Sequence, residues 1–246
     1  MNGNDWNQGS ERMRKQQLIW QTEHETATAI PSLSEQEPSS AVVYFADFLK
    51  KQKITAGKII DIGCGKGRNS IYMAKQGFEV YGVDYIHSAI SICKKLAEQQ
   101  GVSERVHFET GQIDDEWKFA DNFFDIAVDC FSSIDIETKS GREKCRDEIL
   151  RTLKPNGYAF VAVVSAEDEF EKRYMKSNPG TEKNSVVWPQ NGKFQKDYDE
   201  AELQEFYSVF EIVKLEKVTK PAIKCGEKIM ATNYLAILKN SKKALV

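Results

Sequence analysis

The sequence predicts an α/β fold in which a mostly parallel sheet carries helices on both faces, and three observations support this. Strand-like and helix-like segments alternate from residue 38 to about 164, as in strands joined by crossover helices. At 58–77 an apolar strand runs directly into three glycines and a helix. With 41% hydrophobic and 29% charged residues, the 246-residue chain can bury a substantial core within one large domain.

The expected elements follow from local patterns along the chain. Helical spacing of apolar residues predicts helices, here at 41–50, 68–77, 87–100 and 139–153. Short apolar runs between turn signals predict strands, here at 58–63, 79–84, 105–109, 124–130 and 158–164. The run Lys154-Pro155-Asn156-Gly157 ends the last of these helices and turns the chain into the next strand.

The C-terminal part predicts a further helix near 199–208 and two final strands at 209–218 and 232–239. Their connection contains Pro221 and Gly226, so we expect the two strands to pair antiparallel.

Two polar segments interrupt the regular alternation. Residues 1–37 contain Trp6 and Trp20 among charged residues, and residues 165–197 contain further aromatic side chains: Tyr174, Trp188 and Phe194. An insertion of about thirty residues with little periodicity is typical of a functional lid or a mobile loop. We expect an N-terminal cap segment at 1–37 and a main domain at 38–246, with 165–197 contributing to a substrate cap.

The glycine turn carries the clearest functional signal, Asp61-x-Gly63-x-Gly65-x-Gly67. Glycines let the backbone approach a ligand closely, and the following helix N-terminus offers free N–H groups. Asp84 ends the next strand about twenty residues later, where a carboxylate can accept both hydroxyls of a ribose. This pair predicts a nucleoside-containing cofactor, the alternative being an ordinary strand-to-helix turn.

The spacing of the glycines distinguishes between cofactors. A dinucleotide fingerprint places its last glycine where this chain has Arg68. The motif instead resembles motif I of the class I S-adenosylmethionine (SAM) dependent methyltransferases, and the resemblance covers roughly residues 38–164. It implies S-adenosyl-L-methionine as cofactor, a methyltransferase domain at 38–246, and a Rossmann-like seven-stranded sheet of order 3-2-1-4-5-7-6 with an antiparallel last strand. The continuation Gly67-Arg68-Asn69-Ser70 also resembles the small-molecule branch with tellurite-resistance and thiopurine-type methyltransferases.

The same resemblance assigns the cofactor-binding residues, which are Trp20, Asp61, Gly63, Gly65, Asp84, Tyr85, Gln112, Ile113 and Asp129. Gln112 stands where the family often has an Asp that accepts from the adenine amino group, with Asp114 as the alternative partner, and Ile113 would cover the adenine face. Asp129 would lie beside the transferring methyl group, the alternative being that it caps the loop after its strand. Trp20 would close over the cofactor, or pack onto the core instead.

Side chains that act in the chemistry itself are harder to identify. His24, Asp129 and Tyr198 are conceivable general bases, but structural roles fit each of them, so no catalytic residue is assigned. Cys130 is expected to be a small buried residue rather than a nucleophile. The scattered cysteines and isolated histidines predict neither a disulfide framework nor a metal site.

The leading functional prediction is methyl transfer from SAM to a small-molecule acceptor, with release of S-adenosylhomocysteine. The alternatives are a protein or RNA methyltransferase and a SAM-binding regulatory module. A net charge of −3 without a basic tract makes a nucleic-acid partner less favoured. No apolar run approaches the ~20 residues of a membrane span, and the polar N-terminus lacks a signal-peptide pattern, so we expect no membrane partner and a cytoplasmic location.

Overall fold

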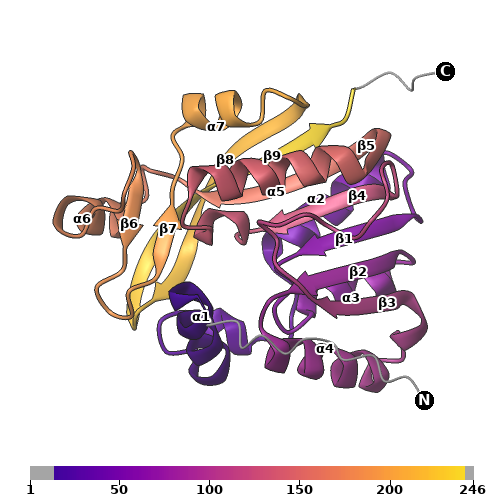
Figure 1. The fold of residues 1–246 in the computed structure, drawn as a ribbon, viewed down its shortest axis with the longest axis horizontal. Coiled ribbons are helices and arrows are strands. Elements are labelled where there is room, and N and C mark those ends of the chain that lie inside the picture. The colour runs from indigo at the N-terminus through magenta and orange to yellow at the C-terminus, as the bar shows by residue number, and fades with distance from the viewer. Residues whose placement is uncertain (1–13, 242–246) are drawn as a thin grey trace, which may run out of the picture.

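The computed structural model describes residues 14–241, and its centre is a seven-stranded sheet of order β3-β2-β1-β4-β5-β9-β8 (Figure 1). The strands are β1 (Lys58–Ile62), β2 (Glu79–Asp84), β3 (Val106–Thr110), β4 (Phe124–Cys130), β5 (Leu153–Val164), β8 (Glu211–Lys224) and β9 (Glu227–Lys239). The first five pair in parallel, whereas β9 is antiparallel to both of its neighbours. The predicted sheet, including its order and its antiparallel last strand, is confirmed.

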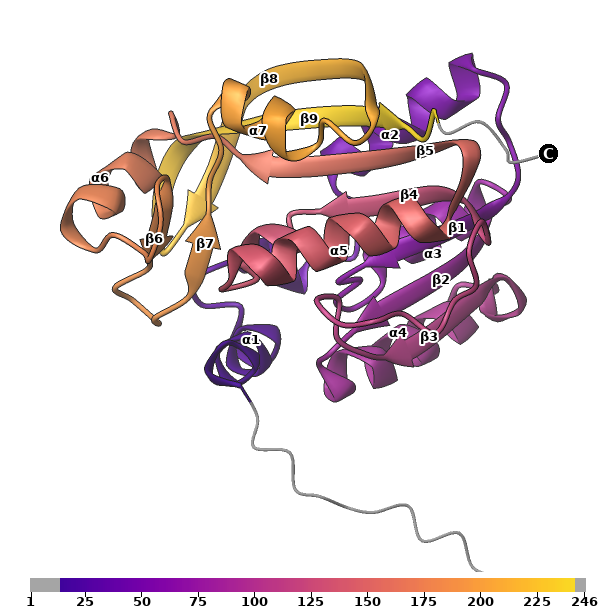
Figure 2. The same cartoon turned by 45° about the horizontal axis from the view of Figure 1, so that its top comes forward.

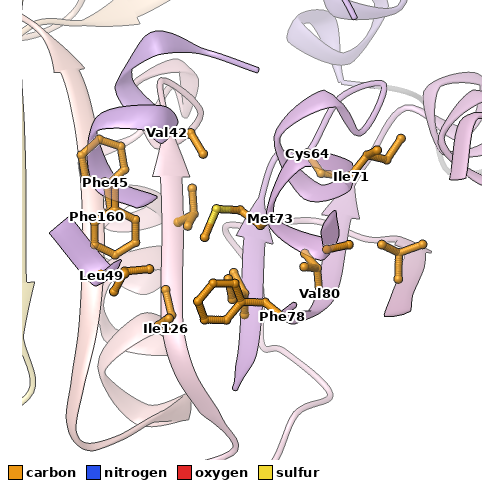
Figure 3. Packing of buried hydrophobic residues seen from close by; sticks show 14 of the residues in the cluster. Val42, Phe45, Leu49, Cys64, Ile71, Met73, Phe78, Val80, Ile126 and Phe160 are labelled. Atoms are coloured by element: carbon orange, nitrogen blue, oxygen red, sulfur yellow. The ribbon is translucent and has the colours of Figure 1, made fainter. Parts of the chain in front are cut away.

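Helices cover both faces of this sheet, as predicted. They are α2 (Ser40–Lys51), α3 (Arg68–Lys75), α4 (His87–Gln99), α5 (Lys139–Thr152) and α7 (Glu200–Phe206). The first three share one apolar cluster with the sheet, and the last two share a second cluster on the opposite face. In the first cluster Phe45 of α2 stacks on Phe160 of β5, with ring centroids 4.9 Å apart (Figure 3).

The parallel register brings the expected ligand-binding segments together. Ile62 of β1 pairs with Val83 of β2 on one side and with Asp129 of β4 on the other. The carboxyl ends of the three strands therefore meet at one edge, where open α/β sheets bind ligands. Helix α1 (Lys15–Thr26) lies near this end of the sheet, on the same side as the elements after β5 (Figures 1 and 2).

The segment 165–197 has more regular structure than its sequence predicted. It folds into α6 (Glu169–Ser177) and a two-stranded antiparallel ribbon of β6 (Ser185–Val187) and β7 (Phe194–Lys196). Phe170 and Trp188 pack edge to face with ring centroids 5.5 Å apart in a third apolar cluster. Elements of three to nine residues are too short to show a clear periodicity in the sequence.

The C-terminal hairpin is longer than predicted. Strand β8 continues through Pro221 to Lys224, and the turn consists of Cys225 and Gly226, both with positive φ. Two such residues match the turns preferred in tight hairpins. Because β8 is an edge strand, it tolerates a proline without an N–H donor. The antiparallel pairing was predicted correctly, but most of the expected connection is strand.

The helices of residues 14–241 are all too short or too polar to cross a lipid bilayer.

Candidate functional site: a cavity at the carboxyl ends of the strands

A cavity of about 900 Å³ lies at the carboxyl ends of β1, β2 and β4. Its wall includes the glycine loop after β1, residues 112–114 after β3, α1, the β6–β7 ribbon and the C-terminal hairpin. Seven of the nine predicted cofactor residues line it: Trp20, Gly63, Gly65, Asp84, Tyr85, Gln112 and Ile113. Asp61 and Asp129 are buried and are not among the lining residues.

The glycine loop requires glycine at two positions for stereochemical reasons. Gly63 and Gly65 have φ of 64° and 55°, a region that other residues rarely adopt. A Cβ on Gly63 would lie 2.5 Å from the side chain of Ser132, whose hydroxyl donates to the Gly63 carbonyl oxygen at 3.2 Å. A Cβ on Gly65 would lie 3.1 Å from Cε1 of His24. The loop is therefore closely covered by the segment after β4 and by α1.

Asp84 holds the glycine loop as well as facing the cavity. Its carboxylate accepts hydrogen bonds from the backbone N–H of Gly65 and of Ile86, each at 2.8 Å. Burial raises the pKa of Asp84, and these N–H donors oppose the increase by stabilising the ionised form. A carboxylate has about four acceptor positions, so acceptor capacity remains for a ligand.

Two further carboxylates stabilise the loops beneath the cavity. Asp61 accepts from the Ser70 hydroxyl at 2.5 Å, and burial raises its pKa to about 7. Asp129 accepts from the backbone N–H groups of Ser132 and Ser133, each at 3.1 Å, and burial raises its pKa as well. The structure thus contains the loop-capping contact that was the alternative role for Asp129.

The cavity wall after β3 contains the two predicted candidates for an adenine contact. The side chain of Gln112 has no hydrogen-bond partner within residues 14–241 and lines the cavity. Asp114 also lines it, but forms an ion pair with Arg14 at 2.5 Å between Nη1 and Oδ2. Gln112 is therefore the more available hydrogen-bonding group.

Helix α1 contacts two parts of the cavity wall, the insertion 165–197 and the segment after β3. Gln16, Trp20 and His24 are four residues apart and all line it. At the insertion, Gln16 donates to the Gly192 carbonyl oxygen and accepts from the Phe194 N–H, each at 3.1 Å. The ion pair of Arg14 connects the same helix to the wall after β3.

His24 is the only one of the three conceivable bases that lines the cavity. Burial, and secondarily the charge of Lys66, lower its pKa to about 4, so the imidazole is neutral at neutral pH. Its Nδ1 is buried without a hydrogen-bond partner in the described part of the chain. By contrast, burial raises the pKa of the Cys130 thiol to about 11, as expected for a side chain that is not a nucleophile.

The part of the cavity wall formed by the β6–β7 ribbon contains a buried cation that the sequence did not indicate. Lys193 lies between β6 and β7, only 3% exposed, with Nζ 3.1 Å from Asp135 Oδ1 and 2.6 Å from Gln195 Oε1. Its Nζ is also 4.3 Å from the ring centroid of Trp188 and 5.3 Å from that of Trp20. A single lysine in a polar segment has no pattern that would distinguish it from a surface residue.

Residues 55–213 match a family model described as a methyltransferase domain. Among curated proteins, the chain is 28% identical over 183 residues to the putative methyltransferase YqeM of Bacillus subtilis, covering 65% of this chain and 72% of the relative. The chain also matches two proteins that are named as RNA methyltransferases, over 30% and 19% of their length.

Solved structures agree with the fold. A SAM-dependent methyltransferase of Methanosarcina mazei has a TM-score of 0.69 at 22% identity, covering 77% of this chain and 94% of that one. The 1,6-didemethyltoxoflavin-N1-methyltransferase of Burkholderia thailandensis, with 1,6-didemethyltoxoflavin and S-adenosylhomocysteine bound, has a TM-score of 0.63 at 15% identity, covering 92% and 88%.

Proposed function

The chain belongs to the SAM-dependent methyltransferase family, and we propose that it transfers the methyl group of S-adenosyl-L-methionine to a small-molecule acceptor. The observation that carries this proposal is the single cavity in which the glycine loop and a second, partly aromatic wall face the same space. Its volume of about 900 Å³ lies in the range of small-molecule sites, roughly 300–1,000 Å³.

The residues at the strand ends fit the cofactor. Gly63 and Gly65 would pass close to its methionine part, Asp84 would accept from its ribose hydroxyls, and Gln112 and Ile113 would contact adenine. Tyr85 and Trp20 line the same space, while Asp61 and Asp129 would act by holding the loops. The bound cofactor supplies an electrophilic methyl group on a sulfonium.

The protein's part in such a reaction is positioning. Orienting two reactants and excluding water can contribute on the order of 7–11 kcal/mol to lowering a barrier. Helix α1 and the β6–β7 ribbon both line the cavity, and Gln16 joins them. We therefore assign the acceptor cap to residues 14–37 and to the insertion 165–197. Residues 1–13, with Trp6, lie outside the described residues.

A small acceptor fits this arrangement better than a macromolecule does. A protein or RNA acceptor needs an open groove beside the transferring methyl, whereas here α1 places His24 directly against the glycine loop. The chain's negative net charge also disfavours an RNA surface. A SAM-binding regulatory module would use the same loop without turnover, so only an assay of the reaction separates it from an enzyme.

The test is an assay with labelled S-adenosyl-L-methionine and a panel of small hydroxyl, thiol, amine and carboxylic-acid acceptors, with a short RNA and a denatured protein as comparators. We expect S-adenosylhomocysteine formation that depends on one class of small acceptor and is lost in Asp84→Ala. Glu109→Ala, which removes an exposed carboxylate on the neighbouring strand, should retain activity. Turnover only with RNA or protein would refute the small-molecule assignment, and cofactor binding without turnover would favour the regulatory module.

A further inference from the structure

We propose that Lys193 recognises a carboxylate on the methyl acceptor, so that the acceptor is a small organic acid. This inference rests on the proposed function, because it assigns a substrate class to the same cavity. It starts from the position of Lys193 in the cavity wall, where its side chain is almost fully enclosed.

The donors of Lys193 are only partly used. An ammonium group has three N–H donors. Within the described residues, Gln195 Oε1 accepts one at 2.6 Å, whereas Asp135 Oδ1 lies 3.1 Å away as an ion-pair partner and accepts no hydrogen bond. The rings of Trp188 and Trp20 flank the same nitrogen and offer it only their π faces. Two of the three donors therefore remain for a ligand in the cavity.

The charge of Lys193 is also incompletely balanced. A buried ammonium is costly unless an anion compensates it, and within the described residues Asp135 is the carboxylate that pairs with it directly, while the buried Asp197 interacts with it at longer range. Burial raises the pKa of Asp135 to about 7, even though Lys193 lowers it. Near neutral pH this carboxyl is thus protonated in a large fraction of molecules. An incoming carboxylate would then complete the compensation.

Lys224, a partly buried lysine of this wall, does not offer the same site. Lys224 lies 2.7 Å from Glu171 Oε1 and 3.8 Å from Asp168 Oδ1, so two carboxylates compensate its charge. Glu171 also accepts from the Trp188 indole N–H at 3.0 Å, which holds this pair in place. Of these two lysines, Lys193 is therefore the one whose charge a bound carboxylate would balance.

The test compares benzoate with benzamide, which differ in charge but hardly in shape. Each is titrated into the full-length protein saturated with S-adenosylhomocysteine, by calorimetry and by the fluorescence of Trp20 and Trp188 beside Lys193. A charge-assisted contact predicts that benzoate binds at least about tenfold more tightly than benzamide. Equal affinities, or no detectable benzoate binding, would overturn the proposal.

Three variants assign such a preference to this site. Lys193→Met should abolish it, Asp135→Asn should strengthen benzoate binding by removing the competing carboxylate, and Lys176→Met should leave it unchanged, because Lys176 is exposed on α6 and does not line the cavity. Binding of S-adenosylhomocysteine reports that each variant is folded. A preference that survives Lys193→Met would refute the assignment. If Lys193→Met does not fold, the Asp135→Asn result decides, since unchanged or weaker benzoate binding there also refutes it.

Failure of this inference is distinguishable from failure of the proposed function. Methyl transfer to neutral acceptors alone would leave the methyltransferase assignment intact and exclude the organic acid. Absence of turnover with every acceptor would count against the proposed function, whatever the benzoate titration shows.

Discussion

Replacing Asp84 by alanine tests the assigned cofactor site most directly. The carboxylate has two kinds of partner, the backbone N–H groups of Gly65 and Ile86 and the proposed ribose hydroxyls. The substitution should therefore change both the stability of the free protein and its affinity for the cofactor.

The two magnitudes follow from the contacts. Leaving a buried N–H donor unpaired costs about 1–3 kcal/mol, so losing both backbone bonds should lower the free energy of unfolding by about 2–6 kcal/mol. A hydrogen bond to a charged group is worth about 1.5–3 kcal/mol. At about 1.4 kcal/mol per decade, losing even one ribose contact should weaken S-adenosylhomocysteine binding at least about tenfold.

The assay combines urea unfolding with calorimetric titration of S-adenosylhomocysteine, below the unfolding transition. Asp84→Asn keeps the shape and one acceptor oxygen, so its losses should be smaller than those of Asp84→Ala. Glu109→Ala is the exposed control and should match the wild type in both measurements. A cooperatively folded Asp84→Ala protein with undiminished affinity would show that another residue holds the ribose.

The remaining predictions concern the loop, the buried imidazole and the cap. Gly63→Ala should weaken cofactor binding and should destabilise the fold by more than Gly101→Ala does. Gly101 has a similar φ of 70°, but a Cβ added there would meet open space. Equal losses of stability in urea unfolding would contradict the predicted clash at Gly63. The pKa of His24 is lowered to about 4, so its own contribution to the free energy of unfolding should be complete above pH 6.5 and fall by about 3 kcal/mol as pH drops from 6.5 to 4. The difference in free energy of unfolding between wild type and His24→Gln should change by this amount over that range, and an NMR titration with a normal His24 pKa would refute it. Amide hydrogen exchange in α1 and in 165–197 should slow when S-adenosylhomocysteine binds. Deleting residues 1–30 should abolish methyl transfer while the sheet stays folded. Exchange rates that do not depend on the cofactor, together with full activity of the truncated protein, would exclude a lid.

The sequence by itself determined the core of the fold and the strand, turn and helix that form one wall of the cavity. Strand, glycine turn and helix follow one another within twenty residues, and Asp84 ends the next strand. Such local signals depend on backbone conformation and on the burial of short apolar runs, which neighbouring residues specify. The helices predicted at 41–50, 68–77, 87–100 and 139–153 all occur with small shifts at their ends.

Only the tertiary structure decided how the rest of the cavity wall is built. Gln16 contacts Phe194 across 178 residues of sequence, and Lys193 meets Asp135 and Trp20, from three separate elements, in one wall. The structure likewise decided that Asp84 holds Gly65 and that His24 covers the loop. Contacts between residues so far apart follow no repeat along the chain. They exist because the parallel strands end at one edge of the sheet and the elements outside the α/β alternation pack over that edge.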